Sequence, residues 1–260
     1  QRRHKRDYIE TFKQVSNGAI GDIVGGNVYW NTGQLWYREP RPEWSEMEYM
    51  IRDWVNWTWL SGDHIVEQHV HNLDVFLWFT GMTPQSAVAF GSRQRRVTGD
   101  QYDNFSVDFV YENGMHLHSM CRQIDGCARN VAEYIRGTKG YAEMDNGGLQ
   151  EIYDTNSNLV WEYDYPEQED SESRWNVKNP YVQEHVDLVT NIRNNTPIVE
   201  AEATAQATMM AIMGRLSAYT GTEVTWDEMM SSDLELGPAQ LQLGPVSGVN
   251  REVAVPGTAS

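Results

Sequence analysis

The densest group of reactive side chains lies in residues 62–74. Three of the chain's seven histidines, His64, His69 and His71, fall within this segment. On a continuous helix, Glu67 and His71 are four residues apart and lie on the same face. A carboxylate beside an imidazole orients the ring and raises its basicity, which suits a general acid–base pair acting on a hydroxyl or carbonyl group. The spacing therefore predicts a catalytic role for His71 and Glu67.

Two other interpretations compete for this segment. It could be an ordinary helix start that Asp63 caps, with solvated polar residues behind it. It could also be a metal site, since Glu67 with His71 or His64 would supply two ligands. However, no two of its histidines have the i, i+4 spacing of a helical zinc site, and His64 and His71 would be roughly 10 Å apart along the axis. We therefore expect no bound metal.

Several other side chains are candidates for contacting a substrate. Aromatic rings offer partly apolar surfaces, and guanidinium and imidazole groups offer hydrogen bonds to hydroxyl or carboxylate groups. The loop over residues 34–47 is rich in such side chains. The substrate-binding candidates are Trp36, Tyr37, Arg38, His64, His69 and His185. For His116 and His118, which share one face of an expected strand, exposure to solvent is the favoured interpretation.

The elements that must position these residues follow from hydrophobic periodicity. Helices are expected over residues 6–17, 63–79, 181–193 and 203–219. In the last two, the apolar faces are Val182, Val186, Val189 and Ile192, and Met209, Ile212, Leu216 and Tyr219. Strands are expected over residues 23–31, 85–90, 105–111, 115–118, 130–136, 141–144, 151–154, 159–163 and 223–226.

The order of these elements predicts an α+β fold. Asn113-Gly114 is a strong hairpin signal, and consecutive hairpins imply an open, mainly antiparallel sheet with helices on one face. We expect a single domain over residues 1–235 and an extended tail over residues 236–260, with a charged loop at 167–174. A large sheet covered on one face is also a natural dimer surface.

Composition excludes several classes of partner. The formal net charge of −17 repels phosphate backbones and anionic lipid, so neither nucleic acid nor membrane is an expected partner. Cys121 and Cys127 are too few for a disulfide framework. No apolar run is long enough for a membrane span, and the compartment is left open. The chain starts at Gln1 without Met, which we interpret as a cut or processed boundary.

The chain also lacks the motif of a dinucleotide-binding turn. No Gly-x-Gly-x-x-Gly occurs in the 260 residues, and Gly18-Ala19-Ile20-Gly21 lies between an expected helix and an expected strand, the wrong order for such a turn. There is also no phosphate-binding Gly-rich Lys loop and no Gly-x-Ser-x-Gly elbow. The sequence therefore predicts no Rossmann domain in this chain.

Together these segments resemble the C-terminal domain of the Gfo/Idh/MocA oxidoreductases, the glucose–fructose oxidoreductase and inositol dehydrogenase family. The family's active-site helix usually carries Asp, then His four positions on, then Asp three further on, and Glu67, His71 and Asp74 occupy these places here. The stretches that carry the resemblance are 1–4, 8–11, 18–23, 62–74 with Gly81, 179–185, 214–221 and 225–228.

The resemblance implies a substrate and a cofactor. The substrate would be a sugar, polyol or glycoside, oxidised or reduced at a carbinol carbon, with His71 transferring the proton beside Glu67. NAD or NADP is implied for the full-length protein, and none for this chain alone. The resemblance also implies homo-oligomerisation and a separate Rossmann domain as partner. In two departures from the family, Glu67 replaces the usual Asp and His69 stands where Gly is common.

Two other functions remain open. The chain could be a stand-alone carbohydrate-binding or dimerisation module without chemistry. It could also be a metal-assisted glycoside lyase or hydrolase that uses Glu67 and His71, which would require an ion near these residues. A dinucleotide-binding strand–helix unit in the upstream coding sequence would favour the oxidoreductase.

Overall fold

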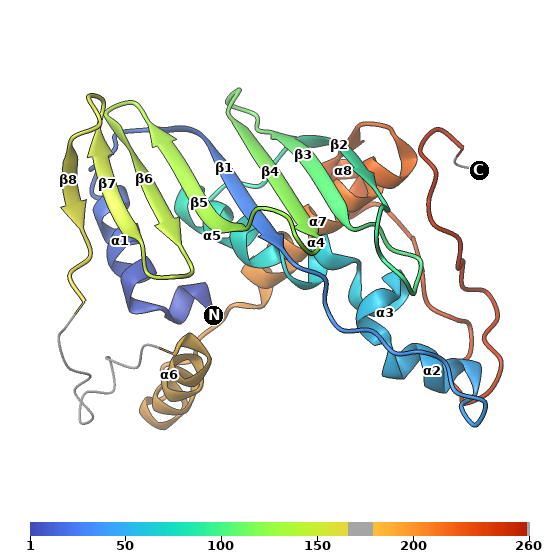
Figure 1. The fold of residues 1–260 in the computed structure, drawn as a ribbon. Helices are drawn as coiled ribbons and strands as arrows, with labels where there is room; N and C mark the ends of the chain where they lie inside the picture. Colours follow the sequence, from blue (N-terminus) through green and yellow to red (C-terminus); the bar gives the residue numbers. More distant parts are fainter. Residues whose placement is uncertain (166–178, 259–260) are drawn as a thin grey trace. The chain divides into compact units, whose positions relative to one another are not determined.

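The computed structural model describes residues 1–165 and 179–258 (Figure 1). The chain divides into two compact units, each built from three separate segments. Unit 1 comprises Gln1–Val28, His71–Met82 and Val131–Ala207, and unit 2 comprises Tyr29–Val70, Thr83–Asn130 and Thr208–Ser260. Strand β1 (Ile23–Thr32) and helix α7 (Ala201–Thr220) each run from one unit into the other. The single domain expected over residues 1–235 stays a prediction.

Unit 1 contains four hairpin-linked strands and the helices that accompany them. The strands are β5 (Asn130–Gly137), β6 (Gly140–Asp145), β7 (Gln150–Asp154) and β8 (Leu159–Glu162). They run in the order β8-β7-β6-β5, with β1 next to β5, and the pairs β5–β6, β6–β7 and β7–β8 are antiparallel. The helices are η1 (Arg2–His4), α1 (Arg6–Ser16), α5 (Val70–Thr80) and α6 (Pro180–Asn194).

Unit 2 contains the other strands and a series of short helices. Its strand order is β1-β4-β3-β2-β9, from β2 (Ser86–Ser92), β3 (Asn104–Val110), β4 (His116–Gln123) and β9 (Val224–Thr225). Its helices are α2 (Glu46–Arg52), η2 (Trp54–Asn56), α3 (Thr58–Ser61), α4 (His64–Glu67) and α8 (Trp226–Met230). As expected, residues 111–115 form the turn between β3 and β4, with Gly114 at a φ of +78°.

The strands alternate between a buried and a more exposed face. In β3, Phe105, Val107 and Phe109 are buried, while Ser106 and Asp108 face outward. In β6, Ala142 and Met144 are buried in the same way. This period of two lets one face of a sheet pack against helices while the other stays open. The predicted α+β class with an open, mainly antiparallel sheet is confirmed.

The prediction of one continuous helix over residues 63–79 is wrong, because the structure has two helices there. Helix α4 ends at Glu67 and α5 begins at Val70. The His69 amide bonds to the His64 carbonyl, five residues back, in a widened turn. Tertiary hydrogen bonds hold the break within unit 2, since Gln68 Oε1 accepts from Trp30 and Gln123 and His69 Nε2 contacts Ser119 Oγ. The i, i+4 geometry assumed for Glu67 and His71 therefore does not apply.

The apolar faces predicted on α6 and α7 are not the faces that are most buried in the structure. On α6, Val182, Val189 and Ile192 are 47%, 44% and 67% exposed, because the helix packs on η1 through Gln183 and Asp187 instead. On α7, small and flexible side chains are fully buried: Ala207, Met210, Ala211, Met213 and Ala218. Met209, Ile212, Leu216 and Tyr219 are only partly buried.

The C-terminal region starts with a shorter strand than expected. Strand β9 ends at Thr225, because Thr225 caps α8 in a reciprocal capping box with Glu228. The tail over residues 236–258 has no helix or strand and packs on unit 2, where Val246 joins a buried cluster with Met47, Met50 and Trp57. The predicted loop at 167–174 lies outside the described residues. In the described part of the chain, no helix is long and apolar enough to cross a membrane.

Candidate active site

His71 lies in the first turn of α5, where its neighbours are tied to η1. Asp74 accepts two hydrogen bonds from Arg3 Nε and Nη2, at 2.9 and 2.8 Å, and the Arg3 guanidinium also lies over the Trp78 ring. A bidentate pair of this kind fixes orientation as well as charge. The start of α5 is therefore held rigidly within unit 1, and with it the backbone that carries the His71 imidazole.

Burial and charge set the protonation state of His71. Its side chain is partly buried, and burial together with the positive charge of Arg2 lowers the pKa of His71 to about 4. Desolvation disfavours the imidazolium, and a nearby cation disfavours it further. The imidazole is therefore neutral throughout the neutral pH range, the form that accepts a proton from a hydroxyl group.

Asn72, the residue next to this histidine, contacts a buried carboxylate, that of Glu133. Asn72 Nδ2 donates to Glu133 Oε1 at 2.6 Å, and the Tyr8 hydroxyl donates to Glu133 Oε2 at 2.8 Å. Arg2 Nε is 3.9 Å from the same carboxylate. Burial raises the pKa of Glu133 to about 7, against the opposing charge of Arg2. Glu133 is thus a titratable group at the centre of unit 1 and ties β5, α1 and α5 together.

Replacing Glu133 with glutamine is expected to flatten the pH dependence of stability. A raised carboxyl pKa means that the folded state keeps its proton to higher pH, so this stability is complete below about pH 4.5 and lost as pH rises through about 7. The loss is at most about 3 kcal/mol. Urea unfolding at pH 5 and pH 8 should show a larger drop for the wild type than for Glu133→Gln. Equal drops would contradict the assignment.

In unit 2, Asp63 organises the start of α4. It is fully buried at a φ of +76°, and its Oδ1 accepts from the His64 amide at 2.5 Å. Its Oδ2 accepts from the Tyr102 amide at 3.0 Å and from the Tyr219 hydroxyl at 2.5 Å. Burial alone raises the pKa of Asp63, but the hydrogen bond from His64 and the nearby charges lower it overall. Asp63 caps α4, as the competing interpretation of this segment proposed, and it also connects α4 to the segments that carry Tyr102 and Tyr219.

His64 and His69 are buried in the same unit. His64 is 2% exposed, lies 3.0 Å from Asp63 Oδ1 through Nδ1, and packs against the Phe105 ring. His69 has no exposed surface, and its Nε2 is 2.6 Å from Ser119 Oγ. Side chains held in this way position the backbone around them.

Glu67 differs from these two histidines. It is only partly buried, and burial raises the pKa of Glu67 against the opposing charge of Arg96. Its Oε2 is buried and has no hydrogen-bond partner among the residues that the structure describes. An acceptor in this state has an unmet requirement for a donor, which a ligand hydroxyl can satisfy.

The aromatic loop presents its rings to solvent. Asp53 Oδ1 accepts from the Arg38 amide at 2.7 Å, and Asn56 Nδ2 donates to the Trp36 carbonyl at 3.3 Å, so the loop backbone is fixed. Trp36 and Tyr37 nevertheless stay 45% and 43% exposed, and the Arg38 guanidinium lies 5.6 Å from the Trp36 ring centroid. A fixed backbone with exposed rings is suited to stacking against a ligand.

His185 lies in unit 1 on the exposed side of α6. Its Nδ1 is 2.7 Å from the Tyr181 carbonyl oxygen, and it lines a shallow depression with His4, Glu184 and Glu200. Asn179 caps this helix by accepting from the Tyr181 amide at 3.0 Å. Among the eight predicted site residues, His71 and His185 therefore belong to unit 1 and the other six to unit 2.

Sequence reasoning missed Glu133 and Tyr8. Glu133 occupies a strand position whose neighbours alternate, and an acidic residue there suggests a solvent-facing side chain. The one signal in the sequence was that Tyr8 and Asn72 could supply hydroxyl and amide donors on inward-facing helix positions. In the described part of the chain, no group of three or more potential metal ligands occurs.

Comparison with known proteins places the fold. A model of the GFO/IDH/MocA C-terminal domain matches residues 8–143. A comparison with curated proteins found no match for this chain. Among solved structures, the aldose-aldose oxidoreductase from Caulobacter crescentus complexed with glycerol is similar, with a TM-score of 0.63 and 17% identity. The similarity covers 86% of this chain and 62% of the Caulobacter protein.

Two further structures extend this comparison. An oxidoreductase from Agrobacterium radiobacter in complex with NAD+, L-tartaric acid and magnesium has a TM-score of 0.64 at 14% identity, over 87% of this chain and 64% of its own. A super-repressor mutant of Gal80p from Saccharomyces cerevisiae has a TM-score of 0.64 at 14% identity, over 90% and 65%. The chain thus spans under two thirds of each relative's length. Because the family model matches more than half of its residues, the chain belongs to the Gfo/Idh/MocA family and carries its C-terminal domain.

Proposed function

We propose that this chain is the substrate-binding and oligomerisation domain of an NAD(P)-dependent oxidoreductase that acts on a CH–OH group of a sugar, polyol or glycoside. The observation that carries the proposal is the neutral imidazole of His71, held at the rigid start of α5 in a domain of this family. The oxidoreductases among the structural relatives, one complexed with glycerol and one with NAD+, support the class of reaction.

In this proposal His71 exchanges the proton of the substrate hydroxyl. During oxidation its neutral ring takes the hydroxyl proton as the carbinol C–H bond breaks, and during reduction its protonated form returns it. A separate Rossmann domain would hold the nicotinamide, which would supply the hydride acceptor or donor for this reaction. Asn72 and Asp74 do not transfer protons but hold the helix start, through Glu133 and Arg3.

Unit 2 has its own candidate side chains for contacting a ligand. Glu67 presents a buried carboxylate oxygen without a hydrogen-bond partner among the described residues, and Trp36, Tyr37 and Arg38 present rings and a guanidinium for stacking and hydrogen bonding. His64 and His69 are buried and act by positioning α4 and the turn after it. The proposed role of His185 is a peripheral polar contact.

The test of this proposal is calorimetric titration of the protein with neutral polyols and aldoses. His71→Ala should weaken the affinity for the substrate at least ten-fold, because the hydroxyl loses its proton acceptor. His116→Ala is the matched control, since His116 is exposed and pairs with Asp108. Equal affinity in the wild type and His71→Ala would contradict the proposal.

A binding module without chemistry is the second candidate. The similarity to Gal80p shows that an argument from fold alone does not identify an enzyme, because that structure is described as a repressor. This alternative predicts that polyols bind and that His71→Ala changes no rate when a cofactor-binding domain and nicotinamide are supplied.

The open face of the unit 2 sheet supports the proposed oligomerisation. Phe90 and Met120 both pair with Ser106 between them, and Val88 lies two residues from Phe90 on the same face. Val88, Phe90 and Met120 are 41%, 74% and 36% exposed. Apolar side chains grouped in this way mark a protein–protein contact. Phe90→Glu should therefore reduce the assembly state in analytical ultracentrifugation while unfolding at the same temperature. An unchanged assembly state would contradict this role for the face.

A further inference from the structure

We propose that unit 1 contains a second binding site, for a neutral saccharide, in the pocket between α1 and β8. The pocket has a volume of about 490 Å³ and is lined by Arg6, Glu10, Gln14, Trp161, Glu162, Tyr163 and Asp164. Small-molecule sites have volumes of roughly 300–1,000 Å³. Neither His71 nor any residue of unit 2 lines it, so this proposal is independent of the function proposed above.

Helix periodicity brings the polar side of the pocket together. Arg6, Glu10 and Gln14 are spaced by four residues on α1 and therefore form one stripe along the helix. Their heads offer a guanidinium donor, a carboxylate acceptor and an amide that does both. Lys13 Nζ donates to Glu10 Oε1 at 3.0 Å, which holds the carboxylate in place on the helix. This stripe suits a ligand whose hydroxyl groups both donate and accept.

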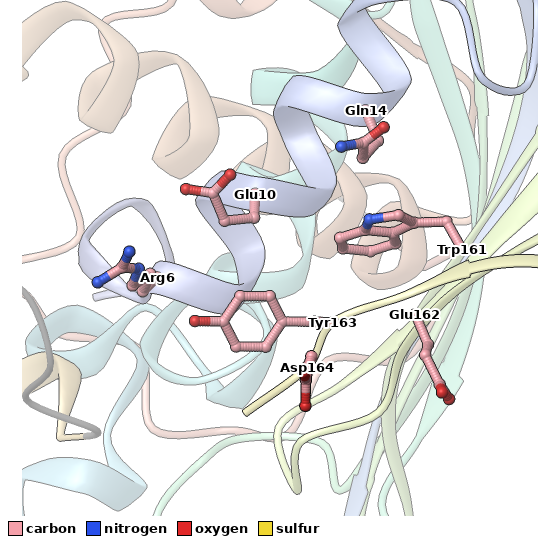
Figure 2. Close-up of a pocket in the computed structure, with 7 residues that line it drawn as sticks. All are labelled: Arg6, Glu10, Gln14, Trp161, Glu162, Tyr163 and Asp164. Carbon is pink, nitrogen blue, oxygen red and sulfur yellow. The ribbon is translucent and has the colours of Figure 1, made fainter. Parts of the chain in front are cut away.

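Strand periodicity supplies the aromatic side. Trp161 pairs with the buried Ile152 of β7, which places it on the side of the sheet that α1 covers, whereas Glu162 pairs with Glu151 on the opposite side. Figure 2 shows the rings of Trp161 and Tyr163 turned toward α1, while Glu162 and Asp164 point away from it. Both rings are partly exposed and lie 6.5 Å apart. They form an apolar wall opposite the polar stripe.

The wall is anchored at its end. The Tyr165 ring packs edge-on against Tyr163 at 4.7 Å, and the Tyr165 hydroxyl donates to Asp7 Oδ2. Asp7 also pairs with Lys5 at 3.0 Å. These contacts tie residues 163–165, which follow β8, to the start of α1. They keep the aromatic wall and the polar stripe facing each other.

Charge selects the class of ligand. The lining carries one positive charge on Arg6 and three carboxylates, on Glu10, Glu162 and Asp164. A net negative lining disfavours an organic acid. Aromatic faces with paired donors and acceptors match the apolar faces and hydroxyl edges of a sugar ring, so the geometry favours a neutral saccharide.

The test is titration of the whole protein with D-glucose, D-galactose, maltose and myo-inositol, with choline and citrate as charged controls. Binding is measured by calorimetry and by saturation-transfer NMR. Trp161→Ala and Glu10→Gln should each weaken the affinity for at least one of these sugars ten-fold or more. Glu202→Gln is the matched control for Glu10→Gln, because Glu202 is an exposed carboxylate on a helix of the same unit and does not line the pocket.

His71→Ala separates this site from the proposed active site. Saccharide binding that persists in His71→Ala, is unchanged by adding Glu202→Gln to it, and is lost on adding Trp161→Ala or Glu10→Gln supports the second site. The proposal is overturned if no sugar of the panel binds to His71→Ala, if that binding survives both added substitutions, or if choline or citrate binds in preference to the sugars. Circular dichroism of each variant shows whether a loss reflects unfolding, and Glu10→Gln on an exposed helix face keeps the test decisive if Trp161→Ala does not fold.

Discussion

Replacing Asp63 with alanine should destabilise unit 2 by about 3–5 kcal/mol, the range for breaking a buried, multiply bonded carboxylate. The change leaves the His64 amide, the Tyr102 amide and the Tyr219 hydroxyl without their acceptor in the interior. Unsatisfied buried donors keep their full desolvation cost. The φ of +76° adds strain for alanine, which has no side-chain hydrogen bonds to offset it.

Denaturant unfolding followed by tryptophan fluorescence measures this effect. Asp233→Ala is the matched control, because Asp233 is exposed in the C-terminal region and should change stability by less than about 0.5 kcal/mol. A loss below about 1 kcal/mol in Asp63→Ala would show that the hydrogen bonds around this residue are not the ones that hold α4 in place.

His71→Ala should lower kcat by about 10²–10⁴-fold when the chain works together with a cofactor-binding domain, the usual contribution of a general acid–base residue. The affinity for nicotinamide should stay unchanged, because no residue of this chain is proposed to hold it. His71→Asn keeps a polar group of similar size and should lose as much, because the amide cannot exchange the proton.

Steady-state kinetics of polyol oxidation across pH 5 to 9 would measure this loss. Because the pKa of His71 is about 4, the wild-type ring is already neutral at the acidic end of this range, so its titration should add no inflection to kcat/KM. A drop of less than ten-fold in both variants would assign the proton transfer to another group.

Periodicity predicted the strands of this fold well, because a half-buried sheet imposes a period of two on the sequence. Residues 105–111 and 141–144 show this alternation, and the structure places β3 and β6 over them. The break between α4 and α5 could not be predicted in this way. Hydrogen bonds from Trp30 and Gln123 to Gln68 impose it, and these partners are distant in sequence.

In the candidate site too, the sequence predicts what depends on neighbouring residues but not what depends on residues far apart in the chain. The cluster of histidines predicted a site in this segment, which stays a prediction. His64 and His69 are buried whereas His71 is only partly buried, and burial depends on residues that are distant in sequence. Glu133 was missed because strand alternation suggests a solvent-facing acid at such a position. Only the fold shows that Tyr8, Asn72 and Arg2 surround it. Likewise, the sequence predicted that the apolar residues of α6 share one face, but not that this face is exposed.

The central claim is that this chain recognises the substrate and leaves the nicotinamide to another domain. The most direct test is calorimetric titration of the wild-type chain with NAD(H), NADP(H) and neutral polyols, each alone and together. The account predicts heat from at least one polyol, no saturable heat from any nicotinamide, and the same polyol affinity with or without nicotinamide present. Saturable micromolar binding of a nicotinamide to this chain alone, with no polyol binding, would contradict it.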